Sequence, residues 1–313
     1  KNNDIDLTIV GPEAPLVLGL VDLFEKNNLL CLGPKRLAAQ MEGSNIIMKD
    51  VLKKGNIPTE TDEVFSDAER AREFLEKCDI PIGLKADGLA GGKGVIVAFS
   101  REEALEGLNS LMVEQKLGSA GDNLVIEEFL KGEEASFIVL CDGENVVPLA
   151  SSQDHKQRDN NDMGPNTGGM GAYSPTPLIT EELNEEIMRE IILPTLDELK
   201  RRGIDYKGFL YAGLMINEQK IKVLEYNCRF GDPETQPILM RMKSDFLDLC
   251  LKAAKQELKG EQIEWDERFA LGVVMASKGY PEKYEIGFPI SGIVEENEAI
   301  KVFHCGTKKE ADE

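Results

Sequence analysis

The chain has 313 residues, of which 42% are apolar and 6% aromatic, an ordinary composition for a globular protein of two or three subdomains. Its 36 basic and 57 acidic residues leave a net charge of −21, which would repel a nucleic-acid backbone or an anionic membrane surface. We therefore expect no nucleic-acid or membrane partner, and local groups must hold any anionic ligand.

Cysteine usage bears on the cellular compartment. The six cysteines are scattered without a C-x-x-C pair and the two histidines lie far apart, so neither a disulfide framework nor a zinc site is expected. With no 18-residue apolar run and no signal peptide, this pattern predicts a cytoplasmic protein. The chain opens with "KNNDIDLTIV", without an initiator Met, which leaves open a targeting segment ahead of it.

The first predicted elements form a β-α-β unit with parallel strands. "DLTIV" (6–10) and "LLCLG" (29–33) are typical of short strands, and "LVLGLVDLFEKNN" between them is typical of one amphipathic helix. A further helix is predicted over about 37–54, ending at "GNIP".

A glycine-rich hairpin is predicted over 82–99, where two apolar runs flank "ADGLAGGKG" (86–94). The glycines let backbone N–H groups approach an anion. The loop is not a Walker A motif, because Asp87 and Gly94 stand where that motif requires glycine and Ser or Thr. It predicts either a cover over a triphosphate or a flexible turn, and a helix is expected over 100–112.

Strands are predicted at "NLVIEEFL" (123–130) and at "ASFIVLCDGENVVPLA" (135–150), which turns at "CDGE". In "EEFLKGEE" (127–134) a strand edge could offer backbone groups to a purine and a carboxylate to a ribose, although such acids are most often solvated turns. Residues 151–175 are predicted to form a long polar loop. Its "GPNTGGMG" (164–171) either presents N–H groups to an anion or is a mobile surface loop.

The last part of the chain adds a metal candidate. A helix over about 181–201 precedes a second hairpin, "FLYAGLMI-NEQK-IKVLEYN", then one helix over 238–258 and a β-rich stretch after Trp265. Strand alternation puts Val223, Glu225 and Asn227 on one face. A carboxylate and an amide oxygen suit Mg²⁺, whereas the alternative is a solvated strand end.

The order of these features is typical of a nucleotide held between sheets, with Mg²⁺ on its phosphates, as phosphoryl transfer requires. Five motifs carry a more specific resemblance: "VGPEAPL" (10–16), "KADGLAGGKGV" (85–95), "EEFLKGEEASF" (127–137), "GPNTGGMGAYSP" (164–175) and "RFGDPETQ" (229–236). They resemble the phosphoribosylamine–glycine ligase family of the ATP-grasp superfamily, and the match runs in order from about residue 6 to 306.

The resemblance implies an α/β (α+β) ATP-grasp fold in three parts. These are a partial N-terminal β-α-β domain (1–43), an ATP-grasp domain (44–254) with a small lid subdomain at about 60–128, and the start of a β-rich C-terminal domain (255–313). It implies the second step of de novo purine biosynthesis. There ATP, glycine and 5-phosphoribosylamine give glycinamide ribonucleotide, ADP and phosphate through a glycyl phosphate.

The resemblance also implies residue roles. ATP would be bound by Lys49, Lys85, Gly88, Gly91, Gly92, Lys93, Gly94, Glu127, Glu128, Phe129, Leu130 and Glu134. Glycine and the phosphoribosyl group would be bound by Gly11, Pro12, Glu13, Asp154, His155, Lys156, Pro165, Asn166, Thr167, Gly168, Gly169, Arg229, Gly231, Asp232 and Glu234. Glu225 and Asn227 would hold Mg²⁺ or Mn²⁺, and the catalytic residues would be Arg229, Lys85 and Asp232.

The chain departs from the family pattern in two respects. "GSNIIMK" has Asn45 and Ile47 where the family usually shows a lysine and an aromatic residue, so one basic contact is missing or replaced. The family's "GGREHA" and "GGRVL" segments are not present, so the sequence looks like the middle of the enzyme. Two alternatives stay open: another ATP-grasp carboxylate–amine ligase, such as a biotin-dependent carboxylase subunit or another purine-pathway member, and an ATP-binding module without turnover. The oligomeric state is not predicted.

Overall fold

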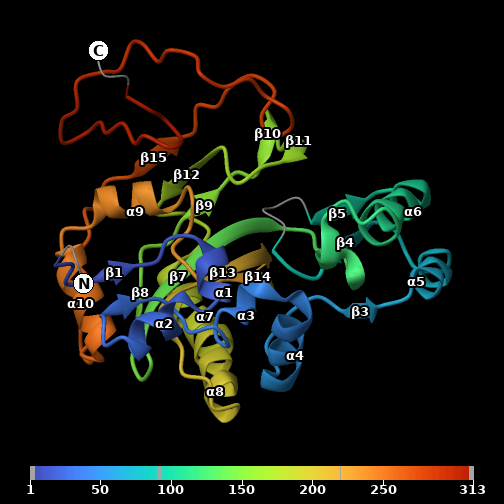
Figure 1. Cartoon of the computed structure of the whole chain (residues 1–313), viewed down its shortest axis with the longest axis horizontal. Coiled ribbons are helices and arrows are strands. Elements are labelled where there is room, and N and C mark those ends of the chain that lie inside the picture. Colours follow the sequence, from blue (N-terminus) through green and yellow to red (C-terminus); the bar gives the residue numbers. More distant parts are fainter. Residues whose placement is uncertain (1–3, 90–93, 219, 310–313) are drawn as a thin grey trace. The chain divides into compact units, whose positions relative to one another are not determined.

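The structure is a computed structural model that describes residues 4–89, 94–218 and 220–309. The chain divides into two units, Lys1–Val274 and Met275–Glu313, and every helix and strand named below lies in the first (Figure 1). Within the described ranges, no helix is long and apolar enough to cross a membrane.

The N-terminal strands β1 (Thr8–Ile9) and β2 (Cys31–Leu32) pair in parallel, as predicted. The single helix predicted between them is wrong: α1 (Glu13–Val17) and α2 (Leu20–Lys26) are separated at Gly19, whose φ of 89° is left-handed. The next predicted helix is also divided, into α3 (Gln40–Gly43) and α4 (Asn45–Gly55). Ser44 between them is extended, and its hydroxyl caps α4 by accepting the N–H of Ile47.

A small sheet follows, with strands β3 (Asp62–Phe65), β4 (Ile82–Ala86), β5 (Val95–Ala98) and β6 (Leu124–Glu128) in the order β3-β6-β4-β5. The predicted hairpin is confirmed as β4–β5. Helices α5 (Ala68–Leu75) and α6 (Arg101–Leu108) lie beside the sheet, and their apolar side chains share a core with Ile82, Leu84 and Ile126 (Figure 1). Lys85 therefore lies on the opposite face of β4.

The strand edge predicted at Glu127–Leu130 is wrong for its first two residues. Strand β6 lies between β3 and β4, so Glu127 is paired with Asp62 on one side and with Gly83 on the other. Glu128 pairs with Ile82, and its N–H donates to the carbonyl of Thr61. The N–H of Glu128 is therefore not free to bind a purine.

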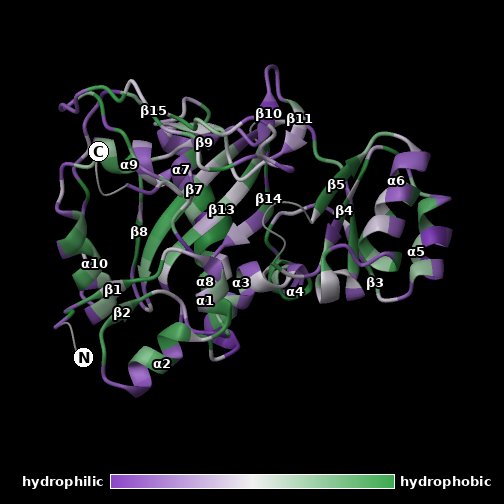
Figure 2. Cartoon of the chain, turned by 45° about the horizontal axis from the view of Figure 1, so that its top comes forward, coloured by the Kyte–Doolittle hydropathy of each residue, from purple (hydrophilic) through white to green (hydrophobic). Residues whose placement is uncertain are grey.

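The central sheet consists of β7 (Glu133–Asp142), β8 (Val146–Pro148), β13 (Lys207–Asn217) and β14 (Lys220–Asn227) in the antiparallel order β14-β13-β7-β8. Both predicted hairpins, β7–β8 and β13–β14, are confirmed. Figure 2 shows hydrophobic colour along β7 and β13, as expected for strands covered on both faces. The helix predicted over about 181–201 is present as α7 (Glu181–Ile187), a π-helical turn (Met188–Ile192) and α8 (Leu193–Arg201).

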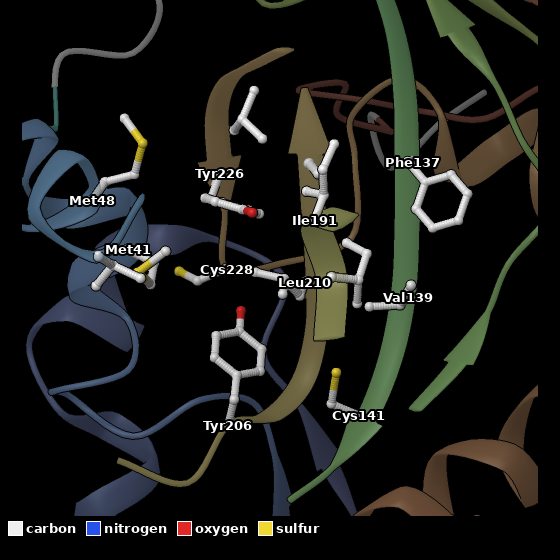
Figure 3. Packing of buried hydrophobic residues seen from close by; sticks show 14 of the residues in the cluster. Met41, Met48, Phe137, Val139, Cys141, Ile191, Tyr206, Leu210, Tyr226 and Cys228 are labelled. Atoms are coloured by element: carbon white, nitrogen blue, oxygen red, sulfur yellow. The ribbon is translucent and has the colours of Figure 1, made fainter. Parts of the chain in front are cut away.

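The two faces of the central sheet carry separate cores. On one face, side chains of α7, α8, α3 and α4 pack against Val139 and Leu210 (Figure 3). On the other, α10 (Phe246–Lys255) packs against Ile138 and Leu140. The single helix predicted over 238–258 is wrong: α9 (Thr235–Arg241) ends where Met242 becomes extended, and α10 begins after a new N-cap residue, Asp245.

The segment predicted as a long loop contains four short strands: β9 (Gln153–Asp154), β10 (Gln157–Asp159), β11 (Met163–Asn166) and β12 (Gly171–Ser174). Strand β12 pairs with β9 and with β15 (Ala270–Val273), which is the strand expected after Trp265. Over residues 275–309 the described structure contains an isolated bridge between Asn297 and Ile300 but no further strand. A domain boundary after residue 254 stays a prediction.

Candidate active site

Two predicted ATP-binding lysines lie in one buried group with two carboxylates, which we call the lysine cluster: Lys49, Glu60, Lys85 and Glu127. Each of the four is at most 6% exposed. The Lys85 ammonium lies 2.5 Å from Glu127 Oε1, 3.4 Å from Glu60 Oε1 and 3.0 Å from the carbonyl oxygen of Leu224. The Lys49 ammonium lies 2.5 Å from Glu60 Oε1 and 3.1 Å from Glu127 Oε2.

The lysine cluster is built from four separate segments. Lys49 comes from α4, Lys85 from β4, Glu127 from β6, and Glu60 from the residues that precede β3. Gly83 lies across from Glu127, and a Cβ there would be 3.1 Å from Glu127 Cγ, so the glycine leaves room for this carboxylate. Lys85 directs its three donors at three protein oxygens. A phosphate can therefore bind Lys85 only by replacing one of them.

The two carboxylates of the lysine cluster have opposite pKa shifts. Burial acts to raise the pKa of Glu60, but Lys85, a hydrogen bond from Glu127 and Lys49 outweigh it and hold this pKa at about 2. Burial raises the pKa of Glu127 to about 7, with Lys85 opposing the shift and Glu60 adding to it. Near neutral pH, Glu60 is therefore ionised, whereas Glu127 is partly protonated.

We predict that Glu127 makes the folded protein less stable as pH rises from 5 to 7. Its folded pKa of about 7 lies above the 4.5 of an exposed glutamate, so over this interval the folded state binds a proton that the unfolded chain has lost. The slope is at most about 1.4 kcal/mol per pH unit. Because the pKa of Glu60 is lowered, this residue changes the pH dependence of stability only below pH 5.

Urea unfolding at pH 5, 6 and 7 measures this slope. Glu127→Gln should make the decline shallower and leave the part that comes from Asp154, whose pKa is also raised to about 7, whereas Glu133→Gln, which changes an exposed carboxylate of β7, should keep the wild-type slope. A Glu127→Gln variant with an unchanged slope would contradict the assignment of the proton.

A second charged group brings together residues predicted for the metal, the ribose and the substrate. The Lys156 ammonium lies 3.1 Å from Glu225 Oε1 and 3.1 Å from Glu134 Oε2. Burial acts to lower the pKa of Lys156, but Glu225 and Glu134 raise it well above its usual value. Lys156 in turn lowers the pKa of Glu225. Burial raises the pKa of Asp154 to about 7, with Lys156 opposing the shift.

A β-bulge in β14 sets the direction of the predicted metal ligands. Val223 lies opposite Leu214 and Glu225 opposite Gly213, so Leu224 is an extra residue. Val223 lies in the core, and after the bulge the core residues are Tyr226 and Cys228 (Figure 3). The prediction that Val223 shares a face with Glu225 and Asn227 is therefore wrong, although those two do share one.

The donor chemistry of this face fits a hard divalent cation. Glu225 supplies a carboxylate and Asn227 an amide oxygen, and Mg²⁺ commonly takes one or two protein ligands and completes its shell with water and phosphate oxygens. Gly213 lies beneath Glu225, where a Cβ would be 3.0 Å from Glu225 Cγ. Among the residues that the structure describes, no three or more His, Cys, Asp or Glu side chains form a group that could hold a metal ion.

Arg229 joins the end of β14 to the N-terminal segment. Its guanidinium donates to Asn227 Oδ1 at 3.2 Å, and it lies 3.3 Å from Glu42 Oε1 and 3.4 Å from Glu13 Oε2. Burial acts to lower the pKa of Arg229, but Glu42 and Glu13 raise it. Neither Glu42 nor Glu60 was among the site residues predicted from the sequence. The position of Glu42, directly before "GSNIIMK", was the available indication.

The two acids of "RFGDPETQ" differ in burial. Asp232 is exposed, whereas Glu234 is 1% exposed and accepts a hydrogen bond from Ser136 Oγ at 2.8 Å. Ser136 Oγ also lies 3.0 Å from the hydroxyl of Tyr211. Glu234 is therefore anchored to the central sheet.

The "GPNTGGMG" loop lies against the same segment. Thr167 is buried, and both its N–H and its hydroxyl donate to the carbonyl of Lys156, at 2.7 and 2.8 Å. A Cβ on Gly169 would lie 2.2 Å from Pro233 Cδ, so only glycine allows this approach. Other predicted substrate residues are half-buried (Pro165, Asn166, Glu13), buried (Gly231) or exposed (Gly11, Pro12, His155, Gly168).

The remaining predicted nucleotide residues surround the β4–β5 hairpin and the end of β6. The carbonyl of Gly94 accepts the N–H of Ala86 at 2.9 Å. Asn45, where the family has a basic residue, donates its side-chain amide to the carbonyl of Ala86 at 2.8 Å. At the end of β6, Glu128 forms an ion pair with Lys222, the ring of Phe129 contacts that of Phe99, and Leu130 is half-buried. In the hairpin loop, Gly88 has a φ of 143°. The predicted residues Gly91, Gly92 and Lys93 lie outside the described residues.

Comparisons with known proteins match this chain to one enzyme family over its whole length. The sequence model of the phosphoribosylglycinamide synthetase ATP-grasp (A) domain matches residues 43–235, and the models of its N and C domains match residues 1–42 and 270–313. The chain is 54% identical over 315 residues to the phosphoribosylamine–glycine ligase of Escherichia coli O157:H7, covering all of this chain and 73% of that protein.

Two solved structures resemble this chain, one in its fold alone and one also in its sequence. The biotin carboxylase of Campylobacter jejuni, in a β,γ-ATP complex, has a TM-score of 0.68 at 17% identity, covering 86% of this chain and 58% of that one, a likeness of fold alone. The phosphoribosylamine–glycine ligase of Thermotoga maritima has a TM-score of 0.78 at 34% identity, covering 91% of this chain and 70% of that one.

The fold and site define an ATP-grasp ligase. Among such enzymes, the matches over the whole chain are to one family. The chain belongs to the phosphoribosylamine–glycine ligase family.

Proposed function

We propose that this protein joins glycine to 5-phosphoribosylamine at the expense of ATP, giving glycinamide ribonucleotide, ADP and phosphate in de novo purine biosynthesis. One observation carries the proposal: the two most family-specific motifs meet, since Gly169 of "GPNTGGMG" packs on Pro233 of "RFGDPETQ". Beside them lie Lys156 and Glu225. The cytoplasmic location stays a prediction.

In the proposed reaction, a glycine carboxylate oxygen bonds to the γ-phosphorus of ATP, and the bond from that phosphorus to the ADP oxygen breaks. The amine of phosphoribosylamine then attacks the carbonyl carbon of glycyl phosphate, phosphate leaves, and the amine loses a proton. The chain's part is to position the reactants and neutralise charge. His155 is exposed, and an amine nucleophile needs little help from a base.

The proposed roles follow the geometry. Lys49 and Lys85 contact the ATP phosphates after these replace a carboxylate of the lysine cluster. Arg229 stabilises the transferring phosphoryl group. Glu225 and Asn227 hold Mg²⁺ or Mn²⁺, which neutralises phosphate charge when bound. Asp232 is exposed and stays a prediction as a catalytic residue.

The test is ADP release by the full-length protein, given ATP and Mg²⁺, with glycine and freshly made phosphoribosylamine omitted in turn. ADP that forms only when both substrates are present supports the ligase. ATP binding without substrate-dependent ADP formation would instead support the alternative of an ATP-binding module without turnover. ADP that forms with bicarbonate in place of glycine would favour the carboxylase alternative.

A further inference from the structure

Glu42 links the predicted catalytic arginine to the backbone of the strand that carries the metal candidates. One carboxylate oxygen, Oε2, accepts the backbone N–H of Cys228 at 2.8 Å and the Cys228 thiol at 3.1 Å. The other oxygen, Oε1, lies 3.3 Å from the guanidinium of Arg229. The Glu42 side chain is 9% exposed, so its orientation is fixed by these contacts and by the surrounding core.

The same guanidinium reaches a predicted metal ligand. Arg229 donates to Asn227 Oδ1 and also to the carbonyl of Phe230, at 3.2 and 3.3 Å. Glu42, Arg229 and Asn227 thus form one chain of contacts, from helix α3 to the end of β14. The other acid near this guanidinium, Glu13, is 31% exposed at its side chain and lies slightly farther away. Glu42 is therefore the better anchored of the two.

We propose that Glu42 is a positioning residue for the ligase reaction: it holds Arg229 in the orientation that serves both the transferring phosphoryl group and Asn227. Glu42 does not touch the reacting atoms. The inference rests on the proposed function, and it adds a residue that none of the recognised motifs contains. Because a small misplacement of a catalytic group can cost about 10²-fold in rate, the loss should appear in kcat.

Glu42→Gln tests the role, because it keeps the size of the side chain and removes the charge that attracts Arg229. We expect kcat to fall about 10- to 100-fold, while the KM for ATP changes less than about threefold. The matched control is Glu198→Gln, which removes a buried carboxylate that pairs with Arg202 at 2.8 Å on α8. This control should lower the melting temperature and leave kcat unchanged.

A double-mutant cycle shows whether Glu42 acts through the arginine. Arg229→Lys keeps a positive charge but loses the planar fork, so this background should be slow yet measurable. In it, Glu42→Gln should lower kcat less than about threefold, since the two changes are coupled. If Glu42→Gln folds poorly, Glu42→Asp is used in the same cycle: it keeps the charge but is one methylene too short for both contacts.

Two results would overturn the inference. One is a folded Glu42 variant with wild-type kcat, and the other is an equal loss of kcat from the Glu42 substitution in the wild-type and Arg229→Lys backgrounds. Failure of the proposed function is distinguishable from either. In that case the wild-type protein itself would show no ADP release that depends on glycine and phosphoribosylamine.

Discussion

Replacing Glu225 with alanine should abolish turnover while leaving the fold intact. The change removes the only carboxylate of the predicted metal pair on β14, and we expect kcat to fall about 10³-fold or more. The fold should survive because Lys156 keeps its contact with the Glu134 carboxylate. No buried cation is then left without a counter-charge.

Steady-state ADP release and thermal unfolding of Glu225→Ala are the measurements. Glu133→Ala is the matched control, because it removes an exposed carboxylate near the start of β7 and should leave both values unchanged. Titration with Mn²⁺ in the presence of ATP adds an independent readout, and the variant should bind Mn²⁺ more weakly. Wild-type turnover in a well-folded Glu225→Ala protein would sink the metal assignment.

Replacing Lys85 with methionine should both destabilise the protein and prevent ATP binding. Lys85 is buried between Glu127 and Glu60, so its loss leaves two carboxylates facing the single ammonium of Lys49. Breaking a buried ion pair by removing one partner costs about 3–5 kcal/mol. Loss of the predicted phosphate contact should remove measurable ATP binding.

A second substitution separates these two effects. At a pH above the Glu127 pKa of about 7, Lys85→Met combined with Glu127→Gln removes one positive and one negative charge, so the free energy of unfolding should recover there while ATP binding does not. Lys54→Met is the control, because the exposed pair of Lys54 with Asp50 should contribute less than about 1 kcal/mol. Tight ATP binding by the stable double variant would show that Lys85 serves only the fold.

Much of the fold could be predicted because its strands are long apolar runs. The strands β4, β7, β13 and β14 and their hairpin partners follow from those runs and from the turns between them. The breaks at Gly19, Ser44 and Met242 could not be placed, since the amphipathic pattern continues across each of them. The strands β9 to β12 are short and polar, and backbone pairing rather than alternation of apolar residues forms them.

The site residues that lie in recognisable motifs could be predicted from the sequence. Single glutamates outside those motifs could not. Lys49, Lys85 and Glu127 were singled out, and the structure brings them together. Glu60 and Glu42 were not, because in a chain with 57 acidic residues a single glutamate outside a motif is most often solvated. What distinguishes these two is burial beside a cation, which the sequence does not display.

The extra residue in β14 ties the length of this segment to its chemistry. Without Leu224 the pairing of Val223 with Leu214 and of Glu225 with Gly213 would become regular, and alternation would still leave Val223 and Tyr226 toward the core and Glu225 and Asn227 on the other face. The bulge residue instead supplies the Leu224 carbonyl oxygen, which lies 3.0 Å from the Lys85 ammonium, so a single-codon deletion here would alter a contact of the lysine cluster although it removes no predicted functional side chain. The extra residue therefore joins the strand of the metal candidates to the lysine cluster through its backbone.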